Sequence, residues 1–207
     1  MQAAPDPHPD DALLSQGLSG NEAALQELLV RNLPALETYV RLRAPELVGP
    51  RESVADLAQS TCREILQDLG RFQHGGADHF RAWLFETAER KLLHRRRHHL
   101  AQRRDVRRVQ ALESEHDAAR YLAGFRGVPT PSSHAEARER LAELVEALGT
   151  LPAADRRLVL LARVARVPRR VLAEREGKSE EALRQALHRA LAALADAIAA
   201  SRPRDSS

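Results

Sequence analysis

Cysteine is almost absent from this chain of 207 residues, in which Cys62 is the only one. A single cysteine excludes an intrachain disulfide and also excludes a zinc site built from several thiolates. Cys62 lies inside a helical pattern, where we expect it to serve as a small buried apolar residue. We therefore expect a reducing compartment, which points to the cytoplasm.

Aromatic residues are also scarce: they make up 3% of the chain, although 43% of its residues are hydrophobic. The core must then consist mainly of Leu, Ala and Val, and no stretch alternates convincingly between apolar and polar residues. Apolar runs such as LVLLA at 158–162 are short, and we find neither a membrane span nor a secretory signal. The composition therefore predicts an all-α protein with no membrane insertion.

Charge is distributed unevenly along a chain whose formal net charge is +3. Residues 1–70 contain eleven acids and five bases, so their net charge is −6. Residues 90–108 contain nine Lys or Arg and a single acid, so their net charge is +8. Such a basic run suits a polyanion, above all nucleic acid, but it is also typical of a solvated helix end. The contrast suggests two partners, or two faces with different roles.

The basic run continues an amphipathic helix that we predict over residues 80–104. Its first half carries apolar and small residues at the spacing of one buried stripe, which includes Trp83. At this spacing Trp83 is more typical of a core residue than of a wedge that opens DNA. His94 and His98 share one face of the helix, but no acid or cysteine joins them nearby, so we predict no metal site.

Helical periodicity predicts three helices in the first half of the chain. Asn21 and Ser53 are suitable N-caps for the first two, because their side-chain oxygens can accept from free backbone N–H groups. Pro34 lies inside the first helix and should kink or split it, because proline lacks a hydrogen-bond donor. The predicted helices cover residues 21–43, 53–69 and 80–104.

The segment 105–133 contains several Gly and Pro residues, and we interpret it as a flexible linker with at most a short helix near its start. Four further helices are predicted beyond it, with Ser179 as the N-cap of the last. The chain thus divides into two small helical domains joined by a flexible linker. The predicted divisions are 1–17 for a flexible leader, 18–104 for the first domain, 105–133 for the linker, 134–200 for the second domain and 201–207 for the tail.

Residues 171–187 have the form of a helix-turn-helix. Ala173 lets the two helices approach closely, and Gly177 supplies the positive φ that a tight turn needs. Glu176 and Lys178 flank this turn, where apolar residues would pack better. Many helix pairs in bundles share this form, so the motif alone leaves DNA binding and a structural role both open. The second helix would direct four polar side chains to a major groove: Arg184, Gln185, His188 and Arg189.

Four stretches of the chain together resemble the bacterial sigma factors of the extracytoplasmic-function (ECF) group. One contains DLAQ, which is similar to the family's D-L-x-Q segment, and another contains FRAWLFETAER, which is similar to its F-x-x-W-L-x-x-I-A-x-N helix. The sequence departs from the family pattern at Ser60, Cys62 and Arg90, where the family has an acid, an aromatic residue and an asparagine. The four stretches are 19–40, 55–72, 80–98 and 130–164, followed by the helix-turn-helix.

The resemblance implies a non-enzymatic subunit that binds core RNA polymerase and promoter DNA and directs transcription initiation, without a metal or cofactor. The linker would run through the polymerase cleft, and the resemblance also allows an anti-sigma protein as a partner. The helix that contains DLAQ would bind the polymerase through Asp56, Gln59, Ser60 and Arg63, with Leu57 and Ala58 either packed or at the contact. A solvated helix face is the other interpretation of these residues.

The DNA contacts that the resemblance implies fall into two sets. The loop before the basic helix would capture an unstacked base of the minus-ten element, and the basic helix would follow the DNA backbone. These minus-ten residues are Gln73, His74, Asp78, His79, Arg90, Lys91, Arg95, Arg96 and Arg97. The helix-turn-helix would read the minus-thirty-five element through Lys178, Ser179, Arg184, Gln185, His188 and Arg189.

Two other functions stay open from the sequence. One is a stand-alone helix-turn-helix regulator, which would bind duplex DNA without polymerase, usually as a dimer on two half-sites. The other is an all-α interaction protein whose basic run only keeps it in solution. We find no Ser/His/Asp arrangement, no phosphate-binding Gly loop and no paired carboxylates with an evident pocket, so no catalytic activity is predicted.

Overall fold

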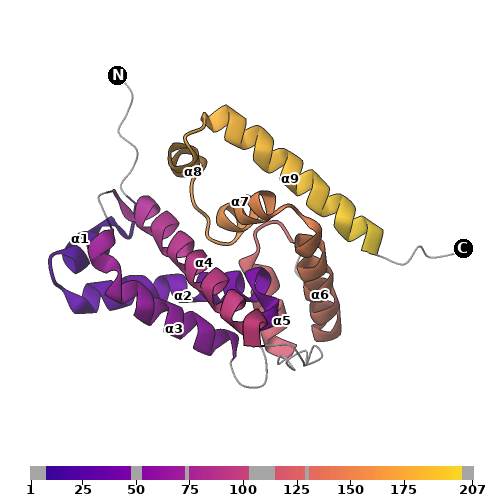
Figure 1. The fold of residues 1–207 in the computed structure, drawn as a ribbon, viewed down its shortest axis with the longest axis horizontal. Coiled ribbons are helices and arrows are strands. Elements are labelled where there is room, and N and C mark those ends of the chain that lie inside the picture. Colours follow the sequence, from indigo (N-terminus) through magenta and orange to yellow (C-terminus); the bar gives the residue numbers. More distant parts are fainter. Residues whose placement is uncertain (1–7, 48–52, 73–74, 103–114, 129–130, 202–207) are drawn as a thin grey trace, which may run out of the picture.

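A computed structural model of the chain describes residues 8–47, 53–72, 75–102, 115–128 and 131–201. Within these ranges the chain forms nine α-helices and two short 3₁₀ helices, and no strand (Figure 1). The all-α class that the composition predicts is therefore confirmed. None of the helices in these ranges is both long enough and apolar enough to cross a membrane.

The first predicted group of helices is present, with boundaries close to those expected. The Asn21 side chain accepts a hydrogen bond from Ala24 N at 3.1 Å, as its predicted role as an N-cap requires. Ser53 and Asp56 form a capping box at the start of the next helix. The elements are α2 (Glu22–Arg43), η1 (Pro45–Leu47), α3 (Val54–Gln67), η2 (Leu69–Arg71) and α4 (Ala77–Gln102).

Pro34 does not divide α2, which continues without a break through this position. The proline is exposed, and so is Val30, whose carbonyl loses its helical partner because Pro34 has no N–H. Water can solvate that carbonyl at the exposed face, while Leu36 and Tyr39 of the same helix are completely buried. Packing of the buried face explains why the helix tolerates the proline.

A short helix, α1 (Asp11–Leu18), lies where the sequence predicts a flexible leader, so that prediction is corrected for residues 11–17. Gly17 approaches α2 so closely that an added Cβ would lie 3.1 Å from Leu25 Cβ. Asp10, just before the helix, is buried and lies 2.9 Å from the guanidinium of Arg31 on α2. Periodicity could not predict this helix, because eight residues offer few apolar positions and its stabilising contacts are tertiary.

The second group of helices forms around the predicted helix-turn-helix, and α9 packs against the other three (Figure 1). Gly177 has φ 62° and ψ 33°, the left-handed conformation predicted for the turn. Lys178 N donates to Ala173 O at 2.9 Å, and Ser179 caps α9 by accepting from Ala182 N at 3.1 Å. The helices are α6 (His134–Thr150), α7 (Ala153–Arg163), α8 (Arg169–Glu176) and α9 (Glu180–Ser201).

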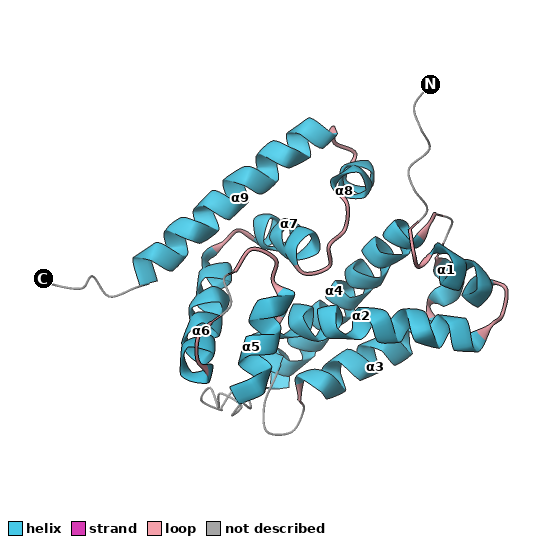
Figure 2. Ribbon diagram, turned by 180° about the vertical axis from the view of Figure 1, so that it is seen from behind, coloured by secondary structure: helices cyan, strands magenta, loops and turns pink. Residues whose placement is uncertain are grey.

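The segment between the two groups contains a packed helix, α5 (Glu115–Gly124), which lies against both α2 and α6 (Figure 2). Gly124 allows a close approach to α2, since an added Cβ would lie 2.4 Å from Thr38 Oγ1. Apolar residues of this segment are buried here: Ala118, Tyr121, Leu122 and Phe125. The helix therefore joins the two groups firmly, while residues 105–114 and 129–130 of the predicted linker lie outside the described residues.

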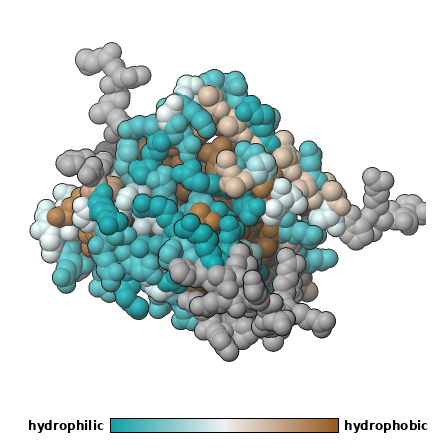
Figure 3. Space-filling model, in the orientation of Figure 1, coloured by the Kyte–Doolittle hydropathy of each residue, from teal (hydrophilic) through white to brown (hydrophobic). Residues whose placement is uncertain are grey.

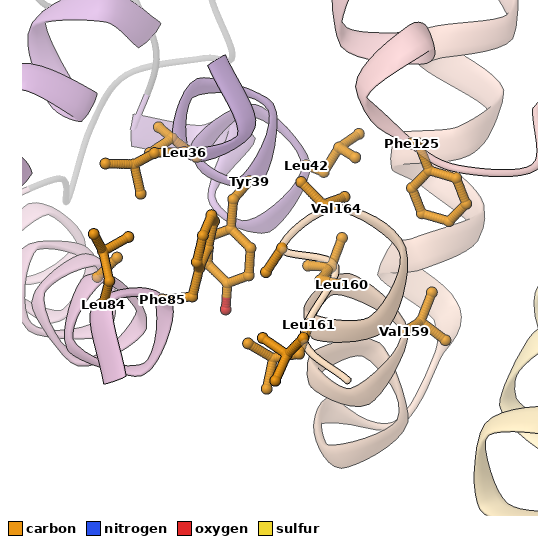
Figure 4. Packing of buried hydrophobic residues seen from close by; sticks show 14 of the residues in the cluster. Leu36, Tyr39, Leu42, Leu84, Phe85, Phe125, Val159, Leu160, Leu161 and Val164 are labelled. Atoms are coloured by element: carbon orange, nitrogen blue, oxygen red, sulfur yellow. The ribbon is translucent and has the colours of Figure 1, made fainter. Parts of the chain in front are cut away.

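One continuous apolar core extends across the two groups of helices. Tyr39 of α2 and Phe85 of α4 meet edge to face, with ring centroids 5.3 Å apart, and both side chains are completely buried. Figure 4 shows them beside Leu160 and Leu161 of α7, which are also buried. The two predicted domains thus pack against each other, an arrangement that the separate periodicities could not show.

Candidate polymerase-binding and DNA-binding surfaces

The residues predicted to bind polymerase lie along α3, and three of them are exposed. Gln59 and Arg63 are four residues apart, which places them on the same face of the helix. Asp56 accepts hydrogen bonds from Ser53 N at 3.1 Å and from Ser53 Oγ at 2.8 Å. These bonds lower the pKa of Asp56, so its carboxylate is charged at neutral pH and available to a cationic partner.

The other two, Leu57 and Ser60, make contacts within the protein instead. Leu57 is completely buried in the core, so of its two predicted roles it has the packed one, and its assignment to the polymerase contact is corrected. Ser60 is half-buried, and its hydroxyl donates to Leu57 O at 3.1 Å. The family pattern identifies the helix that is predicted to contact the polymerase. The burial of each side chain then shows which of its residues face outward and which pack the helix against the rest of the domain.

The basic half of α4 carries less available charge than its sequence suggests. Lys91 Nζ lies 3.3 Å from Glu64 Oε2 and 3.1 Å from Asp68 Oδ2, and Arg95 donates to Glu64 Oε1 at 2.6 Å. Burial raises the pKa of Glu64, but the hydrogen bonds from Arg95 and Lys91 outweigh it, and the pKa is lowered. These pairs fasten α4 to α3 and neutralise part of the basic run.

Arg90 and Arg97 are the exposed residues among the five cations predicted on α4 for the minus-ten element. Arg90 Nη2 donates to Thr87 Oγ1 at 2.9 Å, which holds its guanidinium near the helix. Arg96 is half-buried. The two exposed arginines are seven residues apart, so they lie about two helical turns from each other on one side of α4.

The start of α4 is held by two other parts of the chain. The backbone N–H of its first residue donates to Asp11 Oδ1 at 2.7 Å, so α1 caps α4. Asp78 accepts a hydrogen bond from Arg170 of α8, and His79 Nε2 lies 3.1 Å from Glu174 Oε2 on the same helix. These two predicted minus-ten residues are half-buried, and part of their surroundings is the second domain.

Trp83 belongs to an aromatic cluster near the start of α4. Its ring centroid lies 5.7 Å from that of Phe80 and 5.6 Å from that of Phe72, and Trp83 is 7% exposed. The core role that helical spacing predicts for Trp83 is therefore confirmed. The remaining predicted contacts of this region, Gln73 and His74, lie outside the described residues.

The helix-turn-helix presents all of its predicted minus-thirty-five residues at the surface. Glu181 accepts hydrogen bonds from Arg184 at 2.6 Å and 2.8 Å and from Gln185 at 2.9 Å. These bonds lower the pKa of Glu181 to about 2, so an ionised carboxylate competes with DNA phosphate for Arg184. The exposed residues are Lys178, Ser179, Arg184, Gln185, His188 and Arg189.

An ionic network that the sequence analysis missed crosses from α4 to α7 and α8. Glu86 accepts a hydrogen bond from Arg157 Nη2 of α7 at 3.0 Å and another from Arg175 Nε of α8 at 3.0 Å. Arg157 Nε also lies 3.3 Å from Glu89 Oε2. The sequence signal that could have indicated it is a pair of acids, three residues apart, in the mainly apolar half of the helix.

Glu89 is the buried centre of this network, with an exposed fraction of 6%. Its Oε1 accepts hydrogen bonds from Arg43 Nη2 at 2.8 Å and Nε at 3.0 Å, and its Oε2 accepts from Tyr39 OH at 3.0 Å. Burial, and then the charge of Glu89, raise the pKa of Tyr39 well above its ordinary value. These donors satisfy a carboxylate that would otherwise be costly to bury.

The described ranges, these surfaces included, contain no group of three or more His, Cys, Asp or Glu that could hold a metal ion. Figure 3 shows that one face of the molecule is largely hydrophilic, with paler apolar residues along α9.

Cys62 is half-buried, and burial, with a smaller contribution from Glu37, raises the pKa of its thiol to about 11. The thiol is therefore protonated at neutral pH, as its predicted apolar role requires.

Comparison with known protein families gives a match in each group of helices. Residues 28–102 match Sigma-70 region 2, and residues 141–194 match Sigma-70, region 4. The first match covers most of α2 and all of α3 and α4. The second covers α7 and α8 and much of α6 and α9, so it includes the helix-turn-helix.

Individual relatives are similar over nearly the whole chain. ECF RNA polymerase sigma factor SigD of Mycobacterium tuberculosis is 30% identical over 191 residues, which are 92% of this chain and 84% of SigD. ECF RNA polymerase sigma factor SigF of Caulobacter vibrioides is 33% identical over 185 residues, which are 89% of this chain and 91% of SigF. The solved structure of CnrH in complex with the cytosolic domain of CnrY shares the fold at 24% identity, with a TM-score of 0.58 over 93% of this chain and 99% of that one.

Proposed function

This chain belongs to the extracytoplasmic-function (ECF) RNA polymerase sigma factors. We propose that three of its surfaces bind core polymerase, the minus-ten element and the minus-thirty-five element, one surface for each. As a member of this family, the protein binds core RNA polymerase, recognises promoter DNA and directs transcription initiation. The surfaces lie on α3, α4 and α9, and each is assigned from the residues that it exposes.

The surface of α9 supports the proposal most strongly, because its polar residues are exposed together on the second helix of a helix-turn-helix. Leu183, Ala190 and Leu194 form the buried side of α9, which leaves Arg184 and Arg189 on the outer side. In this motif the second helix enters a major groove, where arginine and glutamine can donate hydrogen bonds to base edges. We assign this surface to the minus-thirty-five element.

The surface of α4 is assigned to the minus-ten element. Arg90 and Arg97 are exposed two turns apart, about 10 Å along the helix axis, and can follow successive phosphates of a DNA strand. Lys91 and Arg95 pair with acids of the first domain, so we assign them to holding this surface in place as well as to DNA. Their share in DNA binding depends on how readily Glu64 and Asp68 release them.

The surface of α3 is assigned to core polymerase. Asp56, Gln59 and Arg63 are exposed along this helix, and their mixture of an acid, an amide and a base suits a polar contact with a protein better than a contact with DNA. The ion pairs to Lys91 and Arg95 lie on α3 at Glu64, beside this exposed set. The polymerase surface and the minus-ten surface would therefore keep a constant position relative to each other.

We further propose that the protein catalyses no reaction itself and works in the cytoplasm, where its polymerase and promoter DNA are found. The family supports both statements, since an initiation factor supplies binding energy and specificity to the polymerase that performs the chemistry. CnrH, which has the same fold, was solved in complex with the cytosolic domain of CnrY. We propose a protein partner of that kind, an anti-sigma protein, for this chain as well.

The test of this function is transcription by core polymerase on a library of promoter sequences. We expect core polymerase to retain the chain in a pull-down experiment and to initiate from a selected set of promoters when the chain is added. The absence of both retention and selective initiation would overturn the proposal. Tight binding of the free chain, as a dimer, to two half-sites on a duplex would identify a stand-alone regulator instead.

A further inference from the structure

Four arginines that belong to none of the surfaces above lie at the turn between α7 and α8. Arg163 is the last residue of α7, Arg166 lies on the turn, and Arg169 is the first residue of α8. Arg126 joins them from the connection after α5, because its backbone N–H donates to Arg163 O at 3.1 Å (Figure 2). The Arg163 guanidinium extends toward the same connection, since a Cβ added at Gly127 would lie 3.9 Å from Arg163 Nη1. We call these four arginines the turn-arginine cluster.

The turn-arginine cluster has no acidic partner within the described part of the chain. Arg126, Arg166 and Arg169 are exposed, and Arg163 is half-buried. None of the four forms an ion pair or a side-chain hydrogen bond with another described residue. The carboxyl-terminal end of α7 carries a partial negative charge, but it amounts to only about half an elementary charge. Four like charges are thus brought together without a paired acid, which suits a polyanionic ligand.

Arg166 has a backbone conformation that is unfavourable for a residue with a side chain. Its φ is 54°, and every other described residue with a positive φ is a glycine. The surrounding structure imposes this conformation, because Val167 N donates to Leu161 O at 3.0 Å while Val164 and Ala165 are buried. Glycine would form the same turn without a steric cost. The shape of the turn therefore does not explain the arginine, and its exposed guanidinium is the part of the residue left to be explained.

The turn-arginine cluster lies near the end of α9 that carries the proposed base-reading residues. In a helix-turn-helix the first helix crosses the DNA backbone while the second enters the major groove, and Arg169 begins that first helix, α8. Besides the hydrogen bonds from Arg184 and Gln185, the charge of Arg169 helps to lower the pKa of Glu181 in the first turn of α9. Arg169 is therefore close to the beginning of α9.

We propose that the turn-arginine cluster is a further phosphate-binding site for DNA, which holds the strand beside the major groove that α9 enters. Arg166 and Arg169 extend the contact of α8 with the DNA backbone, and Arg163 and Arg126 continue it onto the connection between the two domains. The site carries no sequence preference of its own, because phosphates are the same at every base pair. This inference rests on the proposed function of α9 and extends it from the bases to the backbone of the promoter.

The position of the cluster favours DNA over other polyanions. A duplex seated on α9 brings its phosphates to the side of the domain where α8 begins, and guanidiniums bind phosphate oxygens in a bidentate manner. An RNA strand or an acidic surface of polymerase also carries negative charge, but no contact within the chain directs either of them to this turn. Both are distinguished from DNA by the test below.

The test compares promoter complexes that core polymerase forms with the full chain and with its variants. Arg166→Gly removes the guanidinium but permits the positive φ, so it should not lower the urea concentration at the midpoint of unfolding. Arg166→Lys keeps the charge, and Arg138→Ala, at an exposed position of α6, is the matched control. The affinity of each complex for one selected promoter is measured from about 50 to 200 mM salt.

We expect Arg166→Gly to reduce the slope of log affinity against log salt by about one, because one phosphate contact is lost. Arg126→Ala should reduce it by a similar amount, although Arg126 lies outside the helix-turn-helix, and the two substitutions together should reduce it by about two. Arg166→Lys and Arg138→Ala should keep the wild-type slope. A wild-type slope in both Arg166→Gly and Arg126→Ala would overturn the site.

Neutral methylphosphonates in place of single phosphates identify the partner of Arg166. In the wild-type complex, one replacement at the edge of the minus-thirty-five element should weaken binding about five- to tenfold. The same replacement should have no effect in Arg166→Gly, because that contact is already absent. If Arg166→Gly weakens the complex but its effect adds fully to that of every methylphosphonate, the guanidinium binds polymerase or RNA, and the DNA site is overturned.

The site and the proposed function fail separately. If the wild-type chain supports no selective transcription with core enzyme, the sigma-factor function is overturned. The salt slope of the free chain on a duplex then still tests the cluster, with Arg166→Gly compared with Arg138→Ala. If transcription is selective and these two variants have equal slopes in the polymerase complex, the function stands and the phosphate-binding site is overturned.

Discussion

The two proposed DNA-binding surfaces are built in opposite ways. On α9 all six predicted residues are exposed, and Glu181 holds Arg184 and Gln185 only through contacts at the surface. On α4, Lys91 and Arg95 pair with acids of the first domain, and the start of the helix is covered by α8. The more basic segment of the sequence is thus the less available one, because the fold places acids beside its cations. Charge along a chain therefore predicts DNA binding only after the neighbours of each cation are known.

The same contrast separates two acids of α4. Glu86 is partly exposed and binds arginines of the second domain. Glu89 is buried and accepts its hydrogen bonds from Arg43 and Tyr39 of its own domain, with Arg157 of the second domain 3.3 Å away. The first suits a reversible contact and the second a permanent one. Four predictions follow from these two comparisons, in order of decreasing effect.

The largest effect is expected for Glu89→Ala. Arg43 is 5% exposed, so it would be left as a buried charge without its partner, and Tyr39 OH would lose its acceptor. We expect the free energy of unfolding to fall by about 3–5 kcal/mol, measured by urea denaturation. Glu146→Ala, at an exposed position of α6, should stay within about 0.5 kcal/mol of wild type. A loss of less than about 1 kcal/mol for Glu89→Ala would show that the pair is not a permanent anchor.

The next effect is expected for Arg184→Ala combined with Arg189→Ala. If α9 reads the minus-thirty-five element, losing two arginine contacts should lower transcription from a selected promoter about 10- to 100-fold. The unfolding transition should not move, because both side chains are exposed. The control is Arg138→Ala, an exposed arginine on α6 that should leave transcription unchanged. An equal loss of transcription in the variant and in the control would contradict the assignment of α9 to the minus-thirty-five element.

A smaller effect distinguishes Arg97 from Arg95 on α4. Arg97→Ala should reduce the slope of log affinity against log salt for the promoter complex by about one, because one phosphate contact is lost. Arg95→Ala should change this slope less and instead lower stability by about 0.2–1 kcal/mol, since its bond to Glu64 is partly exposed. The reverse pattern would mean that Arg95 leaves Glu64 when DNA binds.

The smallest effect concerns Glu181, whose pKa is lowered from its ordinary 4.5 to about 2 by hydrogen bonds from Arg184 and Gln185. A lowered pKa in the folded chain means that these bonds contribute their full stability above pH 4.5 and lose it as the pH falls toward 2. We expect the carboxyl carbon signal of Glu181 in an NMR titration to change in that lower range. In Arg184→Ala the midpoint should move upward; a midpoint near 4.5 in the wild type would show that Arg184 is free for DNA.

Much of the local structure could be predicted from the sequence. Asn21, Ser53 and Ser179 cap helices, and Gly177 takes the left-handed conformation, because each signal lies within a few residues of the bond or turn that it controls. Trp83 was assignable to the core from its spacing alone. Leu57 shows the limit of family resemblance, because a motif includes the residues that support a surface as well as those that form it.

By itself, then, the sequence determined the class of fold, the extents of most helices and the family, because periodicity, caps and motifs are properties of neighbouring residues. Only the tertiary structure decided that α1 and α5 are packed helices and that Lys91 and Arg95 face acids of the first domain. It also decided that Glu86 and Glu89 bind arginines far away in the chain. Glu89 lies 46 residues from Arg43, and Glu86 lies 71 residues from Arg157. No local pattern predicts such pairs, because they depend on which faces of distant helices share the same core.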